Sequence, residues 1–370
     1  MTSNGSNGPG SLGARICMAR SEGGWRGSGL GNQIFPWAKA YLAAQELGFG
    51  LVPPPFGLNS RDYCREFGTA RLDWLGHAAL RAVLPTVTVT DEMVRSTGMT
   101  DYGAAIRALD AEHGWSRRRS LALLHGGMSG GYLGIAGARE FLRNTLLGRR
   151  PSTRGHQVRP PTDRVRVAVH LRLGDFADSA AGPRPGVFNE SLPVQWYRSV
   201  LDALADRFGG SLQVDLMSDD PAGAARLLPE WHQGRVRARS ALEDLSVMAG
   251  ADLLVCSVSS FSMLAAFLSD APYIWYRPHL SERAGFLSIW GHETEQQAGP
   301  TAANTRAERR GAGEPPARGI AMAAGEEVPP WLVQYLTLRL ALRRPSADLI
   351  HYGVVPADPR GAEEPLPGSR

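Results

Sequence analysis

The residues best suited to gripping a phosphorylated ligand lie in VRVAVHLRLGDF (165–176), where an apolar run ends in His170, Arg172 and Asp175. The run predicts a β-strand, and residues two apart on a strand share a face, so His170 and Arg172 are expected to meet one ligand. A guanidinium matches phosphate oxygens and would stabilise a departing diphosphate, and we expect Asp175 to orient it. A strand-end histidine and an Arg–Asp ion pair without any ligand fit this segment equally well.

A second segment, GADLLVCSVSSFSMLAAFL (250–268), reads as an apolar strand, a serine-rich turn and an apolar helix. Ser259 and Ser260 fall at the expected start of the helix, where hydroxyls and unpaired backbone N–H groups together bind anions. Helix capping alone explains one such serine and is the simpler interpretation of this segment taken by itself. Phe261 is a residue type found more often in a core than in a ligand-binding wall.

The third segment is GSGLGNQIF (27–35), with glycines that allow close backbone approach and two amides, Asn32 and Gln33, at the start of a helix. Its glycine spacing is GxGxG, which differs from the GxGxxG of dinucleotide-binding folds, so we do not interpret it as that fingerprint. A glycine-rich turn followed by a helix still places backbone N–H groups where a phosphate would be bound.

The fourth segment, DLMSDDP (215–221), ends an expected strand with two carboxylates, Asp219 and Asp220. Such carboxylates would serve as a base, in recognition of a nucleobase, or as metal ligands. Asp-Asp-Pro is also ordinary turn and helix-capping chemistry, which is the more common explanation. No DxD motif stands in a metal-like cluster, so the sequence predicts no required metal.

The elements around these segments indicate an α/β protein. Near the start, residues 14–19 and 50–53 are expected strands on either side of a helix over 34–47. From residue 164 strands and helices alternate, which is typical of a parallel sheet with helices on both faces and ligands at the carboxyl ends of its strands. The expected order is strand 164–171, helix 193–208, strand 212–217, helix 221–228, strand 235–238, helix 242–249, strand 253–257, helix 260–268 and strand 273–275.

A chain of 370 residues exceeds the usual domain length, so two domains are expected. An Arg-, Pro- and Ser-rich stretch at 148–163 indicates the linker. The middle of the first domain, 59–148, mixes helical patterns with weak strands such as 86–90 and cannot be ordered. The expected divisions are an N-terminal domain over 14–150, a C-terminal domain over 163–295, a low-complexity excursion over 296–327, and a helix packing back over 328–355.

Composition narrows the possible partners. The 40 Lys and Arg against 36 Asp and Glu leave a net charge of only +4, scattered along the chain, which does not favour nucleic acid as a partner. Three unpaired cysteines, no signal peptide and no apolar run approaching about 18 residues lead us to expect a cytoplasmic protein without a membrane span. Heavy use of Ala, Arg, Gly and Pro is typical of a GC-rich bacterial genome.

Taken in order, the segments resemble the alpha-1,2-fucosyltransferase family, glycosyltransferase family 11, and more distantly the wider fucosyltransferase superfamily. The likeness runs over much of residues 27–275, through GLGNQIFPWAKAYLAAQELG, VAVHLRLGDF, LPVQWYRSVLDAL, VDLMSDDP and ADLLVCSVSSFSMLAAFL. The resemblance implies the GT-B fold, two Rossmann-like domains facing across a cleft with the donor mainly in the C-terminal one. It also implies GDP-fucose as the donor, an inverting single displacement, and no metal cofactor.

The resemblance assigns roles by motif position. Arg172 matches an arginine that binds the β-phosphate of the donor, and His170 matches a residue beside the nucleotide. Asp252 matches an acidic residue that recognises guanine. Two further groups complete the implied donor site: Ser259 and Ser260, with Phe261 after them, near the diphosphate, and Gly31 and Asn32 in the loop that approaches from the other domain.

One position departs from the family pattern: Leu173 stands where many members carry a second arginine, which leaves the donor sugar open. The acceptor, a glycan or a small molecule, is also open because 59–148 matches nothing in the family. Asp178 and Glu190 are the expected candidates for the base that takes the acceptor's proton. The alternatives are a glycosyltransferase of the same fold that uses another nucleotide sugar in secondary-metabolite biosynthesis, and a catalytically silent nucleotide-sugar-binding module.

Overall fold

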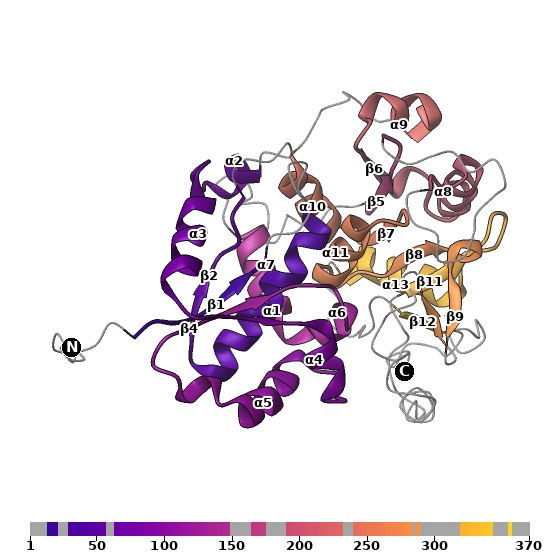
Figure 1. Cartoon of the computed structure of the whole chain (residues 1–370). Coiled ribbons are helices and arrows are strands. Elements are labelled where there is room, and N and C mark those ends of the chain that lie inside the picture. The colour runs from indigo at the N-terminus through magenta and orange to yellow at the C-terminus, as the bar shows by residue number, and fades with distance from the viewer. Residues whose placement is uncertain are drawn as a thin grey trace, which may run out of the picture. The chain divides into compact units, whose positions relative to one another are not determined.

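The structure is a computed structural model that describes residues 13–20, 29–56, 63–148, 164–174, 190–231, 240–283, 286–288, 319–342 and 354–356. The chain divides into two compact units, each described here by itself. Unit 1 comprises Met1–Gly27 and Phe35–Gly127, and unit 2 comprises Ser28–Ile34 and Met128–Arg370. Figure 1 traces both by colour along the chain.

Unit 1 is built on a parallel four-stranded sheet in the order β2-β1-β4-β3. The strands are β1 (Arg15–Ala19), β2 (Gly50–Val52), β3 (Thr86–Val89) and β4 (Leu121–His125). Parallel neighbours require crossover connections, and helices supply them. These are α1 (Leu30–Leu47), whose first turn belongs to unit 2, α2 (Tyr63–Phe67), α3 (Asp73–Val83), α4 (Asp91–Ser96) and α5 (Tyr102–His113).

A buried polar cluster closes the carboxyl edge of this sheet. Lys39 of α1 is fully buried and donates to Asp91 Oδ1 at 3.1 Å and to the Gly126 carbonyl at 3.2 Å. His125, also fully buried, has its Nδ1 2.8 Å from the Tyr102 hydroxyl. Burial chiefly, and then the Lys39 charge, lower the pKa of His125 to about 3, so its imidazole is neutral. The cluster therefore ties α1, α4 and α5 to the ends of the strands.

Unit 2 is built on a parallel five-stranded sheet in the order β11-β8-β7-β5-β6. Its strands are β5 (Val165–Leu171), β6 (Leu212–Ser218), β7 (Leu253–Val255), β8 (Tyr273–Tyr276) and β11 (Gly319–Met322). The chain enters at β5, moves outward to β6, returns to the other side of β5 as β7, and continues to β8 and β11. The strand order therefore reverses between β5 and β7, which in doubly wound sheets is where ligands bind.

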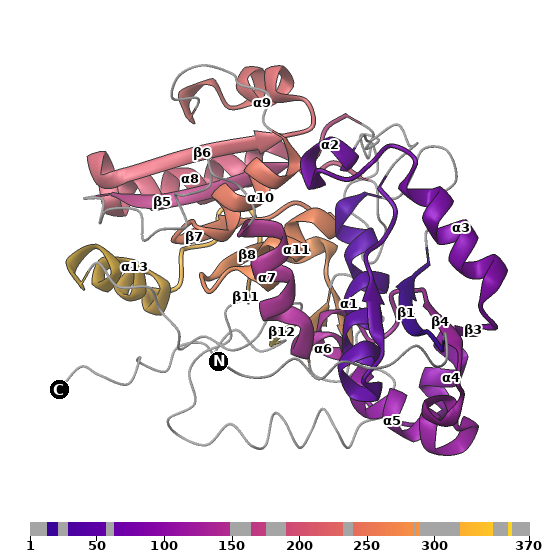
Figure 2. The ribbon, with the colours of Figure 1, turned by 90° about the vertical axis from the view of Figure 1, so that its left-hand side faces the viewer.

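Helices flank this sheet, as Figure 2 shows for α8, α10 and α11. Those described are α6 (Gly131–Gly134), α7 (Arg139–Leu147), α8 (Val194–Phe208), α9 (Pro221–Leu227), α10 (Ala241–Ala249), α11 (Ser260–Leu268) and α13 (Pro330–Leu342). A small antiparallel sheet in the order β12-β10-β9 joins β9 (Ser281–Arg283), β10 (Phe286–Ser288) and β12 (Val354–Pro356). Among the described helices, none is long and apolar enough to cross a membrane.

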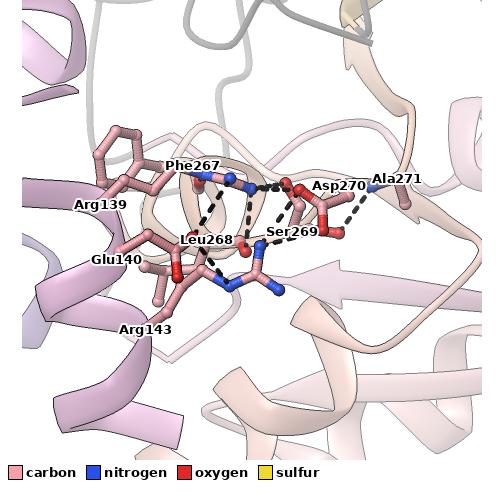
Figure 3. Close-up of polar contacts among 8 residues, drawn as sticks. All are labelled: Arg139, Glu140, Arg143, Phe267, Leu268, Ser269, Asp270 and Ala271. Atoms are coloured by element: carbon pink, nitrogen blue, oxygen red, sulfur yellow. Dashed lines mark hydrogen bonds and ion pairs between the residues drawn. The ribbon is translucent and has the colours of Figure 1, made fainter. Parts of the chain in front are cut away.

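Helix α7 is attached to unit 2 by two arginines, drawn in Figure 3. Arg139 donates to the carbonyls of Phe267, Leu268 and Ser269 at 2.6, 3.3 and 2.8 Å, and to Asp270 Oδ1 at 2.6 Å. Arg143 donates to Asp270 at 3.2 and 3.0 Å. The carbonyls at the end of a helix lack partners within it, so Arg139 caps the carboxyl end of α11.

The domain boundary differs from the one expected from the sequence. We predicted a first domain over 14–150, but the compact units divide between Gly127 and Met128. The segment that contains α6 and α7 belongs with unit 2, and the Arg139 contacts give the physical reason. Of the expected linker over 148–163, residues 149–163 lie outside the described residues, and so does the expected strand at 235–238.

The sequence predicts one low-complexity excursion over residues 296–327, and the structure corrects this prediction for residues 319–322. Residues 319–322 form β11, which pairs with β8 in parallel and is largely buried. The Trp196 indole N–H donates to the Met322 carbonyl at 3.0 Å. A short apolar run in a Gly- and Ala-rich stretch has too weak a pattern to predict a strand whose stability comes from its neighbour.

The expected fold class is confirmed: the chain is an α/β protein with two Rossmann-like units, each on a parallel sheet. Two such domains are what the GT-B class comprises; that they face each other across a cleft stays a prediction. Most expected strands and helices of the second half occur within a residue or two of their predicted bounds.

Replacing Arg139 with glutamine is expected to lower the free energy of unfolding of unit 2 by about 2 kcal/mol, because charged hydrogen bonds to three carbonyls and a carboxylate are lost. Urea denaturation measures this. The matched control is Arg226→Gln, because the Arg226 side chain is 73% exposed and lies 3.8 Å from its acidic partner. Equal losses in both variants would contradict the capping role.

Candidate functional site

The carboxyl edge of the unit 2 sheet, at the reversal of strand order, gathers polar side chains from separate parts of the chain. His170 comes from the end of β5, Ser257 follows β7, and Ser262 lies in the first turn of α11. The strand order reverses between β5 and β7, and in doubly wound sheets ligands reach the strand ends at such a point. We describe this edge as the candidate site.

His170 is 4% exposed and held by hydroxyls. Its Nδ1 lies 2.7 Å from Ser262 Oγ and 3.0 Å from Ser257 Oγ, and the two hydroxyl oxygens are 3.2 Å apart. The Tyr197 hydroxyl donates to the backbone carbonyl of His170 at 3.2 Å. The Phe261 ring centroid lies 5.5 Å from that of the imidazole. These contacts give the ring one orientation at the strand end.

The imidazole of His170 is neutral at physiological pH. Burial chiefly, and then the positive charge of Arg172, lower its pKa to about 4, against a smaller opposing effect of Asp219. A neutral imidazole hydrogen-bonds to a ligand without adding charge to the site. His170 is therefore suited to positioning a ligand rather than to donating a proton at neutral pH.

Arg172 is held at the strand end by Asp219, which follows β6. Because Leu171 pairs with Ser218 in register, the next residues on the two strands meet, and Arg172 Nη1 lies 3.3 Å from Asp219 Oδ2. Burial favours the neutral form of Asp219, but the amide of Leu173, the charge of Arg172 and the amide of Gly174 outweigh it and lower the pKa of that carboxyl. Asp219 therefore stays charged and fixes both the guanidinium and the loop after β5.

Among the described residues Asp219 is thus a carboxylate that orients Arg172, a role that the sequence pattern does not predict for it. Asp175, the expected partner, lies outside the described residues. Asp220 accepts a hydrogen bond from the Gly223 amide at 2.9 Å and caps α9, as the structural interpretation of Asp-Asp-Pro predicted. The two adjacent carboxylates therefore have different roles.

The start of α11 is tightly constrained. Ser259 is the N-cap, and its hydroxyl accepts from the Phe261 amide at 3.2 Å, so the capping interpretation holds for this serine. The Tyr132 hydroxyl donates to the Ser260 carbonyl at 3.3 Å. A Cβ atom at Gly31 would overlap the backbone of Ser260, so only glycine fits there.

Because Gly31 packs on Ser260, the first turn of α1 lies against the first turn of α11. Asn32 belongs to this turn, and its amide donates to the Gly29 carbonyl at 2.9 Å. Helix amino ends have unpaired N–H groups and a partial positive charge, so two of them side by side favour an anion. Gly31, Asn32, Ser259 and Ser260, predicted to bind the donor together, all lie at this junction.

Asp252 lies at the opposite edge of the sheet. It precedes β7, is 7% exposed, and accepts from the Arg166 amide at 2.9 Å and from Arg339 at 2.7 Å. This ion-pair network joins α13 to the beginning of β5. Its predicted role in reading guanine stays a prediction, and the candidate site described here does not include it.

Of the two expected catalytic bases, Glu190 and Asp178, the structure describes only Glu190. Glu190 is 5% exposed and lies four residues before α8, whereas Asp178 lies outside the described residues. Among the described residues, no group of three or more His, Cys, Asp or Glu side chains is arranged to hold a metal ion. Both the identity of the base and the metal independence stay predictions.

Sequence reasoning did not predict Ser257 and Ser262 as members of the site, and it gave Asp219 other roles than that of a partner of Arg172. Each stands within a few residues of the end of a strand in a predicted parallel sheet, and this is the signal that would have found them. Their partners depend on which strands are neighbours. Neighbour order is a tertiary property, so Asp219 could not be paired with Arg172 in advance.

No protein-family model matches the chain, and no curated protein sequence matches it. Among solved structures, the crystal structure of POFUT1 in complex with GDP-fucose is similar over 71% of this chain and 95% of that one, with 14% identity and a TM-score of 0.38. The E. coli heptosyltransferase WaaC with ADP is similar over 80% of this chain and 98% of that one, with 16% identity and a TM-score of 0.38. Likenesses this distant do not identify a family or an activity.

The His170 imidazole is expected to titrate near pH 4. Below about pH 6.5 His170 gains a proton in the unfolded chain but not in the folded one. As the pH is lowered from about 6.5 to about 4, His170 therefore lowers the free energy of unfolding by up to about 1.4 kcal/mol per pH unit. Urea denaturation at several pH values measures this slope, and the His170→Gln variant is expected to reduce it. The His170 resonance is assigned by its loss in the His170→Gln variant. If that resonance titrates near pH 6.5 in the folded protein, the buried, neutral assignment is contradicted.

Replacing Asp219 with asparagine is expected to lower the free energy of unfolding by about 1.5 kcal/mol, because the ion pair and one charged hydrogen bond to the loop are lost. Asp220→Asn is the matched control, since asparagine caps a helix as well as aspartate does. Chemical denaturation of both variants measures the difference. A loss for Asp220→Asn as large as for Asp219→Asn would argue against the anchoring role.

Proposed function

We propose that this chain is an inverting glycosyltransferase that moves a sugar, L-fucose from GDP-fucose, to a hydroxyl group of a glycan or small-molecule acceptor. One observation carries the proposal. A guanidinium fixed at the end of β5 and the adjoining amino ends of α1 and α11 lie in the same unit, at the edge where the strand order reverses. This set of groups suits the two phosphates of a nucleotide sugar.

Arg172 is the proposed phosphate-binding residue. Its side chain is 21% exposed, and Asp219 holds one of its nitrogens. A guanidinium whose position is already fixed by a carboxylate loses little freedom when phosphate oxygens bind it. The neutral His170 is proposed to position the nucleotide beside it, with Phe261 packed against the imidazole.

The proposed chemistry is a single displacement. The acceptor oxygen attacks the anomeric carbon of the sugar, the bond from that carbon to the β-phosphate oxygen breaks, and the nucleoside diphosphate leaves with the electron pair. Arg172 and the helix amino ends would stabilise the charge that develops on the leaving group. The acceptor proton goes to a carboxylate, for which Asp178 and Glu190 are the proposed candidates. These fixed positive groups would serve in place of a metal ion.

The proposal that the donor carries fucose as its sugar and guanine as its nucleobase rests on the resemblance of the segments to fucosyltransferases. Leu173, in place of a second arginine, favours a second candidate: an enzyme of the same fold that uses another nucleotide sugar. In the structure the backbone amide of Leu173 donates to Asp219 at 2.9 Å, so this residue contributes to anchoring rather than charge. A silent nucleotide-sugar-binding module is the third possibility, and the turnover measurement below separates it.

Isothermal titration of GDP is expected to show binding that Arg172→Ala weakens by about tenfold to a hundredfold, the loss of one or two charged hydrogen bonds. Arg226→Ala, an exposed arginine on α9, is the control and should bind as wild type does. UDP, ADP and dTDP tested in parallel identify the base. Equal GDP affinity in wild type and Arg172→Ala would refute the proposed phosphate site.

Release of GDP from GDP-fucose in the presence of a panel of glycan and small-molecule acceptors tests turnover. An enzyme releases GDP with at least one acceptor, and Arg172→Ala lowers that rate more than its loss of affinity explains, because the charge develops in the transition state. A silent module binds GDP and releases none from the donor with any acceptor. Release from a different nucleotide sugar would favour the second candidate.

A further inference from the structure

Two enclosed hydroxyl groups surround one nitrogen of the His170 ring. Ser257 is 2% exposed, Ser262 is fully buried, and His170 itself is 4% exposed. The two Oγ atoms lie 3.0 Å (Ser257) and 2.7 Å (Ser262) from His170 Nδ1, and 3.2 Å from each other. Polar groups so deeply buried must meet their hydrogen-bonding needs through their neighbours. The two hydroxyls and Nδ1 therefore form one closed hydrogen-bonding set.

The number of protons in this set determines which ring nitrogen is protonated. Each hydroxyl has one proton to donate, and a neutral imidazole has one proton, on either Nδ1 or Nε2. If Nδ1 is unprotonated, one hydroxyl donates to it and the second hydroxyl donates to the first, so both protons have acceptors. If Nδ1 carries the proton, the ring donates to one oxygen and that hydroxyl donates to the other, which leaves one hydroxyl proton without an acceptor in the set. Only the first arrangement satisfies every buried donor of the set.

The Cys256 thiol also interacts with this set, through Ser262. Cys256 is fully buried, and burial raises the pKa of its thiol, so the sulfur keeps its proton at neutral pH. A thiol is a weak donor and a weak acceptor, so its sulfur does not replace the oxygen or nitrogen acceptor that a protonated Nδ1 would require. Cys256 therefore leaves the preference for an unprotonated Nδ1 in place.

The other ring nitrogen of His170, Nε2, has a different environment. Its ring makes its hydrogen bonds to described residues through Nδ1, so Nε2 has no partner among them. Nor is Nε2 one of the fully enclosed polar atoms that lack a partner, a group that includes the corresponding nitrogen of His125. The small surface that His170 exposes therefore includes Nε2. This is the atom through which the ring would meet a ligand.

We propose that Ser257 and Ser262 are positioning residues that hold His170 as its Nε2–H tautomer, so that the ring donates one uncharged hydrogen bond to a phosphate oxygen of the bound nucleotide. Ionised phosphate oxygens only accept hydrogen bonds, so a fixed N–H suits them, whereas the lone pair of an unprotonated nitrogen would repel them. Ser262 lies in the first turn of α11, and Arg172 follows His170 by two residues, so the ring belongs to the same edge as the groups proposed to bind the diphosphate. The ligand rests on the proposed function, whereas the tautomer does not.

Nitrogen-15 NMR of the ligand-free chain, labelled at histidine, measures the tautomer, because protonated and unprotonated imidazole nitrogens have well separated resonances. The His170 signals are assigned by their loss in His170→Gln. Wild type at neutral pH is expected to show a protonated Nε2 and an unprotonated Nδ1, and the double variant Ser257→Ala/Ser262→Ala is expected to show a measurable share of Nδ1–H. The matched control is Ser269→Ala, which removes a hydroxyl from a serine 1% exposed at the other end of α11 and should keep the wild-type tautomer.

Isothermal titration of GDP tests the role in binding. The double serine variant is expected to lose about threefold to tenfold in affinity, which corresponds to about one hydrogen bond, whereas Ser269→Ala should bind as wild type does. Two substitutions of His170 form a matched pair. The amide of glutamine presents an N–H near the position of Nε2, whereas the shorter asparagine reaches about as far as Nδ1, so His170→Gln is expected to bind GDP at least about threefold more tightly than His170→Asn. A role of His170 in packing alone predicts equal losses.

Two results would overturn this inference and leave the transferase function standing: a protonated Nδ1 in ligand-free wild type, or a double serine variant with unchanged tautomer or unchanged GDP affinity. If circular dichroism shows that this variant has lost its fold, GDP titration of labelled wild type replaces it. GDP is then expected to shift the Nε2 resonance of His170 more than that of Nδ1, and the reverse order would also overturn the inference. A wild type that binds none of GDP, UDP, ADP and dTDP refutes the transferase function and the ligand role of His170 together, and the ligand-free spectrum still decides the tautomer.

Discussion

The candidate site of unit 2 depends on the interaction of the Asp219 carboxylate with Arg172 and with the backbone amides of Leu173 and Gly174. This carboxylate stands at the end of β6, and its three partners stand at the end of β5, so it ties two parallel strands together at their carboxyl edge. Burial alone would favour a neutral carboxyl, yet the lowered pKa shows that its donors prevail. Arg172 is thus held in place while its side chain stays 21% exposed, which suits a residue proposed to bind an anion.

The rest of unit 2 supports that edge through contacts that are remote in sequence. Ser257 and Ser262 hold the His170 ring, and Gly31 allows the first turn of α1 to approach Ser260. At the other end of α11, Arg139 caps the carbonyls and fixes the helix against α7. Residues from before residue 150 therefore hold α11 at both of its ends. The proposed diphosphate site depends on the start of this helix.

The two units contribute different properties to the proposed enzyme. Unit 2 holds the fixed positive groups suited to a nucleotide diphosphate. Unit 1 has, at the carboxyl edge of its sheet, a hydrogen-bonded cluster around Lys39 and the neutral His125.

The sequence by itself determined the α/β class, the alternation of elements from residue 164, and the position of Arg172 and Ser259 at element ends. Those features follow from local periodicity and from the chemistry of strand and helix termini, which short segments record. Only the tertiary structure decided that Asp219 is an ion-pair partner of Arg172, that residues 319–322 form a strand, and that α7 belongs with unit 2. Each of these depends on which strands are neighbours and on contacts between residues distant in the chain, and no local pattern specifies strand order.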